Sequence, residues 1–268
     1  MTCEQKIIIA GPCSAESEIQ TWIAATMVTT AISAVLGKNK VRVAIRSPLT
    51  KEPTFPSTWI GPGEEGFRWL VDACKESDAI PATEITSVQE AIVVLRLCNE
   101  LQVNKLFIWF GSRFFKGQEI KKAIHLLMNG VTDLQVGLKN PPNANTRDWE
   151  GRIAWALAGG IAPSNLWLIG RGHDPQGLDN PLELRNLPND EETMSLGKKH
   201  GLKIISDPSH KGGTSEKVLT VLQETPNDQF DGWMLETCPT RTKTDDKQRL
   251  DTENFIQAVQ VISNFIQP

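Results

Sequence analysis

Several features that would assign a protein to a specialised class are missing from this sequence. No apolar run reaches the length of about 18 residues that a membrane-spanning helix needs, so no transmembrane segment is expected. A strand is predicted to begin at Lys6, which leaves no room for a signal peptide before it. Fixed-period repeats and low-complexity segments are also missing. Tyrosine does not occur, although there are eight tryptophans, and we have no physical account of that absence.

The charge and the cysteines exclude two further classes. The net charge is −4, with 22% charged residues and no basic patch with interleaved aromatics, which argues against binding to nucleic acid. The five cysteines are odd in number and widely spaced, unlike the paired cysteines of a secreted disulfide framework. We therefore expect reduced thiols and a cytoplasmic protein that binds neither nucleic acid nor a membrane.

What the sequence does contain is an alternation of two patterns. Short runs rich in Val, Ile and Leu are typical of parallel strands buried on both faces, and they occupy residues 6–10, 41–45, 80–85, 105–110, 134–138, 166–169, 202–206 and 232–235. Amphipathic stretches of helical length follow them, at residues 18–37, 63–77, 88–100, 116–129, 146–158, 190–200, 215–224 and 252–266. Eight such units in 268 residues predict an α/β fold, a closed (β/α)8 TIM barrel that forms a single domain over residues 1–268. The Pro-, Asn- and Gly-rich stretch 172–190 is interpreted as a long loop over the catalytic face.

Basic side chains follow several of the predicted strands. In barrels of this type the chemistry lies at the carboxyl ends of the strands, and those ends carry Arg46, Lys51, Arg113, Lys139 and Arg171. Arginine makes bidentate contacts with phosphate or carboxylate, and lysine supplies a point charge. The sequence therefore predicts a ring of cations that binds a phosphate and a carboxylate.

A second set of strand-end residues is typical of a metal site. Cys13 follows the first predicted strand, His210 the seventh and Glu236 the eighth, with Asp245 and Asp246 shortly after Glu236. Thiolate and imidazole suit Zn, Fe, Mn or Co better than Mg, and carboxylates widen that range. In a closed barrel the eighth strand lies between the first and the seventh, so these side chains are expected to converge.

Each of these signals has an ordinary structural explanation when it is taken alone. A cysteine at a strand end is usually a small buried hydrophobe, and a histidine after a serine is usually a turn residue. Five basic residues among 28 are compatible with solvated loop charges, and Asp245-Asp246-Lys247 with an exposed turn. The joint occurrence at the ends of nearly all eight strands favours an active site. His125 and His200 lie inside predicted helices and are interpreted as surface or packing residues.

Six motifs stand in colinear order over nearly the whole chain. They are Gly11-Pro12-Cys13-Ser14-Ala15-Glu16-Ser17, Gly63-Glu64-Glu65-Gly66, Leu138-Lys139-Asn140-Pro141, Arg171-Gly172, Arg185-Asn186-Leu187-Pro188 and Asp207-Pro208-Ser209-His210-Lys211-Gly212-Gly213. This set resembles the 3-deoxy-D-arabino-heptulosonate 7-phosphate (DAHP) synthase family, above all the short type I-beta-like enzymes, some of which are fused to chorismate mutase. The first and last motifs together are specific to the superfamily that also contains KDO8P synthase. The resemblance implies a cytoplasmic homodimer or tetramer of the shikimate pathway, with a chorismate mutase domain or protein as a possible partner.

The resemblance also implies a reaction and a role for each candidate residue. The reaction is the condensation of phosphoenolpyruvate with erythrose 4-phosphate, and it releases phosphate. One divalent ion (Mn, Fe, Co or Zn) would be held by Cys13, His210, Glu236 and Asp245, with Asp246 competing for the last place. Phosphoenolpyruvate would be held by Arg46, Lys51, Arg113, Lys139 and Arg171.

Three residues are expected to act directly in catalysis, namely Lys51, His210 and Cys13. Lys51 would lie near the reacting carbons and protonate the aldehyde oxygen, with its pKa lowered by the nearby cations. Asp207 is expected to orient His210 or Lys139. Thr54 belongs to the segment that would bind the second substrate.

That segment departs from the family pattern. In Lys51-Glu52-Pro53-Thr54, Pro53 stands where the family's Lys-Pro-Arg-Thr motif has the arginine that holds the aldehyde phosphate. Proline has no charge and no N–H donor, and a lost Arg–phosphate contact costs roughly 1.5–3 kcal/mol. Three hypotheses stay open: DAHP synthesis itself, condensation of phosphoenolpyruvate with a different aldehyde, and a weakened paralogue that binds or regulates a chorismate mutase.

Overall fold

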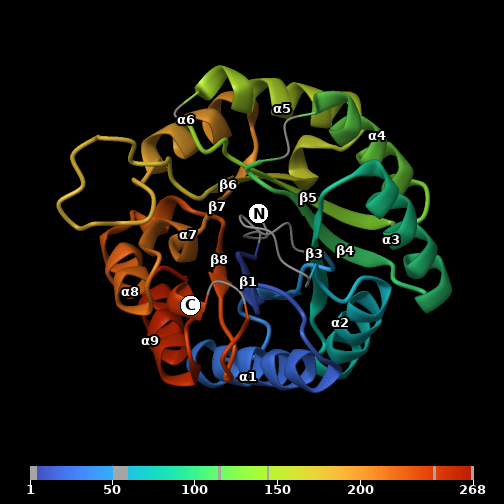
Figure 1. Cartoon of the computed structure of the whole chain (residues 1–268), viewed down its shortest axis with the longest axis horizontal. Coiled ribbons are helices and arrows are strands. Elements are labelled where there is room, and N and C mark those ends of the chain that lie inside the picture. The colour runs from blue at the N-terminus through green and yellow to red at the C-terminus, as the bar shows by residue number, and fades with distance from the viewer. Residues whose placement is uncertain (1–4, 51–59, 114–115, 144, 244–245, 267–268) are drawn as a thin grey trace.

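The strands close into one parallel barrel around a packed interior. The computed structural model describes residues 5–50, 60–113, 116–143, 145–243 and 246–266. Each strand pairs with the next along the chain, and the first also pairs with the last (Figure 1). The strands are β1 (Ile7–Gly11), β2 (Arg42–Arg46), β3 (Ile80–Ile85), β4 (Lys105–Phe110), β5 (Asp133–Lys139), β6 (Leu166–Gly170), β7 (Lys203–Ser206) and β8 (Gly232–Glu236). The predicted (β/α)8 barrel is confirmed.

Helices form a ring outside the barrel (Figure 1). They are α1 (Glu18–Leu36), α2 (Glu64–Ser77), α3 (Val88–Leu101), α4 (Gly117–Met128), α5 (Thr146–Ala158), α6 (Asp190–His200), α7 (Pro208–Gly212), α8 (Ser215–Glu224) and α9 (Thr252–Ser263). Three 3-10 turns add Pro163–Asn165, Asn227–Gln229 and Asp246–Gln248. Side-chain caps fix several starts, because Ser17 accepts from the Gln20 amide and Ser87 from the Glu90 amide. The short helix α7 was not predicted from the sequence.

Alternation along each strand divides the core into two layers. Side chains of one parity fill the barrel, and they comprise Ile7, Ile9, Ala44, Ala82, Phe107, Trp109, Trp167, Ile169, Ile205 and Met234. Those of the other parity, such as Ile8, Leu106 and Leu235, pack against the helices. The interior is therefore closed below the carboxyl ends of the strands, and polar chemistry is confined to those ends.

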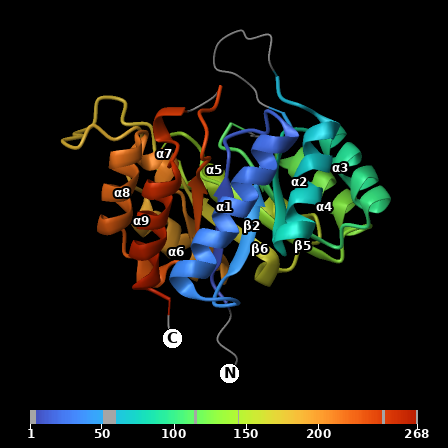
Figure 2. The ribbon, with the colours of Figure 1, turned by 90° about the horizontal axis from the view of Figure 1, so that it is seen from below.

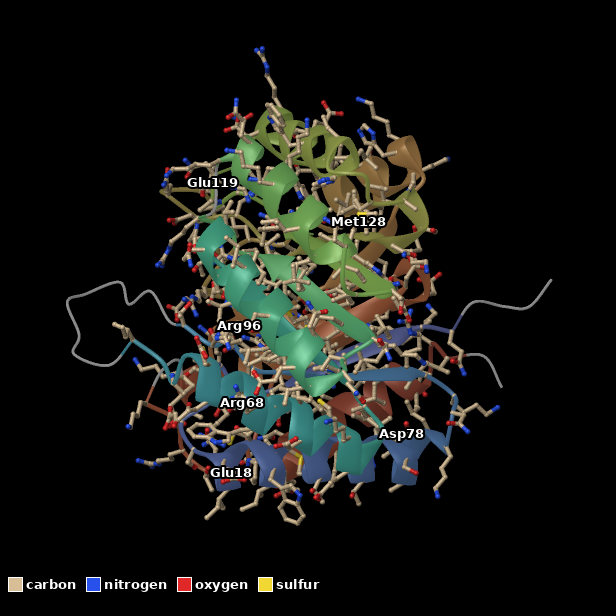
Figure 3. All side chains as sticks on the ribbon, turned by 90° about the vertical axis from the view of Figure 1, so that its right-hand side faces the viewer. Glu18, Arg68, Asp78, Arg96, Glu119 and Met128 are labelled. Carbon is tan, nitrogen blue, oxygen red and sulfur yellow. The ribbon has the colours of Figure 1, made fainter. Side chains whose placement is uncertain are left out.

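The outer surface carries exposed ion pairs between neighbouring helices. Arg68 of α2 contacts Glu100 of α3 at 2.7 Å, and Arg96 of α3 contacts Glu64 of α2 (Figure 3 labels both arginines). Solvent and salt screen such pairs, so they contribute little to stability. They differ in this respect from the buried ion pairs at the carboxyl ends of the strands.

Helix α1 differs from the other helices in composition. Among the described residues it is the one helix long and apolar enough to cross a membrane by length and composition. This departs from the sequence expectation, because threonines, a serine and a glutamine interrupt its apolar run without adding charge between Glu18 and Lys38. In the structure it lies in the helical ring and packs against β1, α2 and α9, with seven residues buried. A core helix of a soluble protein passes the same composition test.

The loops that follow the strands gather at one end of the barrel. The longest described one, residues 171–189, joins β6 to α6 and stands out at the upper left of Figure 2. An antiparallel bridge between His173 and Leu187 closes its base. The predicted long loop is thus confirmed, and it rises on the side where the strand ends carry the candidate residues.

Candidate active site

Asp207, which directly follows β7, joins two of the predicted site residues. Its carboxylate is fully buried and lies 2.9 Å from Lys139 Nζ and 2.9 Å from His210 Nδ1. It also accepts from the His210 amide at 3.1 Å, which caps α7 and fixes the start of that helix. Burial works to raise the pKa of Asp207, but His210 and Lys139 hold it well below its ordinary value. The expectation that Asp207 orients His210 or Lys139 is met by contacts to both.

His210 is held in one tautomer by this contact. An ionised carboxylate only accepts, so Nδ1 carries the proton that faces Asp207, and Nε2 is left with its lone pair. Nε2 lies 3.9 Å from Glu236 Oε1. Burial lowers the pKa of His210 to about 4, so the ring is neutral at neutral pH. A neutral imidazole backed by a carboxylate is the arrangement that proteins use for a metal-ligating histidine.

Glu236, at the end of β8, faces Arg46 from the end of β2. The Arg46 Nη1 and Glu236 Oε1 atoms are 3.0 Å apart, and both side chains are buried. Gln248 donates to the other oxygen of Glu236. Burial works to lower the pKa of Arg46, but Glu236 and then Cys13 raise it above its ordinary value. Cys13 is itself buried just after β1, whose Gly11 is in register with Glu236.

Part of the donor capacity around Arg46 is not used by the described residues. The buried Nε and Nη1 atoms of Arg46 and the hydroxyl of Ser47 have no hydrogen-bond partner among the described residues. Nη1 lies close to Glu236 Oε1, but this contact lacks hydrogen-bond geometry. Buried polar atoms without partners are rare in folded proteins, and they are expected where a ligand binds. An anion with oxygen acceptors would satisfy these donors.

Three further arginines add positive charge near the carboxyl ends of the strands. Burial lowers the pKa of Arg171, the charges of Arg185 and Arg113 lower it further, and Asp207 opposes them. Three arginines thus act on one another at the ends of β4 and β6 and in the loop 171–189. Asn140 fixes Arg171, because its side chain accepts from the Arg171 amide at 2.8 Å and donates to the Gly172 carbonyl at 2.9 Å. The mouth of the barrel is therefore strongly cationic.

Sequence reasoning missed Arg152 of α5, which supports this cationic region from behind. Its guanidinium is buried and donates to the carbonyls of Lys139 at 3.0 Å, Ser112 at 2.8 Å and Gly111 at 3.4 Å. These carbonyls lie at the ends of β4 and β5, so Arg152 fixes the backbone that carries Arg113 and Lys139. A signal was present in the sequence, since position 152 falls on the same helical stripe as the buried Trp149, Ile153 and Ala156.

An Arg152→Met variant is expected to lose about 3 kcal/mol of stability, because it leaves buried carbonyls without their donor. It should also bind inorganic phosphate more weakly, since the strand ends that carry Arg113 and Lys139 lose their support. Urea unfolding and calorimetric titration measure the two effects. Arg147→Met, at an exposed position of the same helix, is the matched control. Equal phosphate affinity in the two variants would contradict the assigned role.

The remaining residues considered in the sequence analysis either lie outside the described residues or have other contacts. Lys51, Pro53, Thr54 and Asp245 lie outside the described residues. Asp246 Oδ1 accepts from the Thr242 amide at 3.0 Å and from Arg249 Nε at 2.7 Å, so this oxygen is already engaged. His200 lies 3.4 Å from Glu150, and His125 is exposed on α4, as expected for surface residues. Within the described part, no group of three or more His, Cys, Asp or Glu side chains is placed to hold a metal.

Barrel and site together form a (β/α)8 fold with buried cationic side chains at the carboxyl ends of its strands. The sequence model of the DAHP synthetase I family matches residues 3–265, and the chain belongs to this family. It is accordingly a transferase of the 3-deoxy-7-phosphoheptulonate synthase class. Enzymes of this class catalyse the aldol-type condensation that serves aromatic biosynthesis. The resemblance seen in its motifs is thereby confirmed.

Solved structures support the same fold. The crystal structure of DAHP synthase from Thermotoga maritima has a TM-score of 0.77 and 23% identity, over 97% of this chain and 68% of that one. A truncated form of the same organism's enzyme has a TM-score of 0.72 and 22% identity, over 96% of this chain and 84% of that one. At these identities the likeness concerns the fold alone. No curated protein matches the chain in sequence.

Proposed function

We propose that this protein condenses phosphoenolpyruvate with erythrose 4-phosphate in a metal-dependent reaction, giving DAHP and inorganic phosphate. The observation that carries the proposal concerns the buried Arg46: its pKa is raised, yet its Nε and Nη1 atoms have no hydrogen-bond partner among the described residues. Lys139 and Arg171 are buried as well, at the end of β5 and directly after β6. A small substrate with one phosphate and one carboxylate provides enough oxygen atoms for these cations and for Arg113.

The side chains of the site account for binding and for charge stabilisation. Arg46, Lys139, Arg171 and Arg113 would hold phosphoenolpyruvate and stabilise the charge that develops on it. C3 of phosphoenolpyruvate would form a bond to the aldehyde carbon, water would add at C2, and cleavage of the C–O bond would release phosphate. Lys51 keeps its proposed role as the donor of a proton to the aldehyde oxygen. Asp207 would keep Lys139 and His210 in place throughout.

The donor types around His210 suit a divalent metal, although the described residues by themselves do not group three ligands for one. Its neutral ring presents Nε2 to the carboxylate of Glu236, and Cys13 is buried close enough to Arg46 to raise the pKa of that arginine. We propose that Cys13, His210 and Glu236, with Asp245, hold one Mn, Fe, Co or Zn ion. When bound, this ion would supply Lewis-acid polarisation of the aldehyde carbonyl. Cytoplasmic location, a homodimeric or tetrameric assembly and a single domain over residues 1–268 belong to the same proposal.

Phosphate release in the presence of Mn²⁺ tests the reaction. The protein is incubated with phosphoenolpyruvate and a panel of aldehydes, before and after chelation and dialysis. Turnover of erythrose 4-phosphate that is lost on chelation and restored by the metal is the expected result. Turnover of another aldehyde alone would favour condensation of phosphoenolpyruvate with a different aldehyde. Absence of turnover together with tight binding to a chorismate mutase would favour a weakened paralogue with a regulatory role.

Pro53 gives a separate expectation about the aldehyde. A Pro53→Arg variant restores the Lys-x-Arg-Thr pattern and should lower KM for erythrose 4-phosphate about 10- to 100-fold, the equivalent of one charged hydrogen bond. Steady-state kinetics measure the change, and KM for phosphoenolpyruvate serves as the internal reference because it should stay the same. A variant whose two KM values are both unchanged would contradict a phosphate site at this position.

A further inference from the structure

Trp109 of β4 lies beneath the cations of the site and has no role in the reaction described so far. It faces the barrel interior, between Glu84 of β3 and Gly137 of β5 in the strand register, and is 1% exposed. The guanidinium carbon of Arg46 is 5.2 Å from the centroid of its ring. Lys139 Nζ is 6.0 Å from the same centroid. One indole therefore contacts two cations that come from different strands.

The strands make room for this large side chain. Position 137, the inward-facing neighbour of Trp109 on β5, is a glycine. A Cβ there would stand 2.6 Å from Ile169 Cδ1, which would have to move, and 3.2 Å from Trp109 Cβ, which is a tight contact. Trp109 and Gly137 thus form a large–small pair that brings an aromatic face to the level of Arg46 and Lys139.

An indole has a physical advantage over a carboxylate at this place. Arg46 and Lys139 are buried, and two desolvated cations repel one another unless nearby groups stabilise them. Each already has a close carboxylate, Glu236 for Arg46 and Asp207 for Lys139, and the charge of Glu84 also acts on Arg46. A further carboxylate in place of the indole would give these groups a net negative charge and repel an anionic substrate. The face of an indole attracts both cations, takes no N–H donor from the substrate and leaves the positive charge intact.

We propose that Trp109 is a positioning residue for the anionic substrate, since its ring holds Arg46 and Lys139 together as one anion-binding unit. This inference rests on the proposed function for the identity of the anion as phosphoenolpyruvate. It adds a residue that touches neither the reacting atoms nor the metal site. Its contribution should therefore appear in substrate affinity rather than in the rate of the bound complex.

A series of fluorinated tryptophans at position 109 tests the electrostatic part of this role. Fluorine withdraws electrons from the ring face and weakens its attraction for cations while the shape of the side chain is nearly kept. The residue is introduced into the full chain by nonsense suppression, and binding of phosphoenolpyruvate and of inorganic phosphate is measured by calorimetry. The expected result is a stepwise rise in Kd with each added fluorine, reaching about tenfold for the most fluorinated ring. KM should follow Kd, with kcat nearly constant.

Trp167 of β6 provides the matched control. It is also buried in the barrel, and Lys203 Nζ lies 4.8 Å from its ring centroid at the start of β7, away from the site. Fluorination there alters the same kind of contact and should leave both Kd values unchanged. A flat series at position 109, or equal slopes at positions 109 and 167, would overturn the inference. If the natural protein binds phosphate but not phosphoenolpyruvate, the proposed function fails, and the slope measured with phosphate still decides the role of Trp109.

Discussion

A Lys139→Met variant should be both strongly destabilised and nearly inactive. The substitution keeps most of the side-chain volume but removes the charge 2.9 Å from the fully buried Asp207. Breaking a buried ion pair on one side leaves an uncompensated charge, which costs about 3–5 kcal/mol. Loss of one charge-stabilising donor from the site should lower kcat/KM about 10²- to 10³-fold. Urea unfolding measures the first effect and phosphate release the second.

Two further variants separate these effects. In Lys139→Met/Asp207→Asn no buried charge is left alone, so most of the lost stability should return while the activity stays low. The amide oxygen at position 207 of this double variant can still accept the hydrogen bond from His210, so the imidazole keeps its orientation. Arg68→Met breaks an exposed ion pair and should change neither quantity appreciably. Recovery of activity in the double variant would refute the role of Lys139 in binding the substrate.

The strands could be predicted from the sequence because their burial leaves a simple pattern. Strands β3 and β4 have the predicted bounds, 80–85 and 105–110, and the other six differ from theirs by one residue at one or both ends. A parallel strand covered by helices outside and by the packed interior needs apolar residues at nearly every position. Such runs are distinctive, and turns rich in Gly and Pro separate them from the helices.

Helix α7 could not be predicted from hydrophobic periodicity. Its five residues begin with Pro208 and end at Gly212, and Gly213 follows, a composition that indicates a turn rather than a helix. The helix forms because Pro208 suits its first turn and the Asp207 side chain accepts from the His210 amide. Both effects depend on local hydrogen bonds that hydrophobic periodicity does not record. This short helix nevertheless orients His210 toward Glu236.

Several positions of the candidate site could be predicted from the sequence, but most of its contacts could not. The positions of Arg46, Lys139, Arg171, His210 and Glu236 follow from counting to the ends of the strands. A contact of Asp207 with Lys139 or His210 was expected, whereas the pairing of Arg46 with Glu236 was not, because it joins the ends of β2 and β8 across β1. Trp109 could be assigned to the barrel interior by alternation, but its contact with two cations depends on the side chains of three strands.

Replacing His210 by glutamine is expected to abolish metal binding and to lower activity about 10³-fold or more, since Lewis-acid activation contributes several kcal/mol. Glutamine can still donate to Asp207, so the fold around α7 should be kept while the Nε2 donor toward Glu236 is lost. Titration with Co²⁺, followed by its visible absorption and by metal analysis, measures binding without reference to turnover. His200→Gln, at a histidine that contacts only Glu150 among the described ion pairs, is the control and should bind one equivalent.

Cys13 allows the same measurement to identify a second ligand. A thiolate bound to Co²⁺ gives an intense near-ultraviolet charge-transfer band, and a Cys13→Ser variant should lack this band while the weaker bands from His210 coordination remain. The two variants together distinguish loss of one ligand from collapse of the site, because each removes a donor from a different strand end. Full Co²⁺ affinity in both variants, with the charge-transfer band intact in Cys13→Ser, would exclude this ligand set. The buried histidine–carboxylate pair would then have to be explained by the binding of the substrate alone.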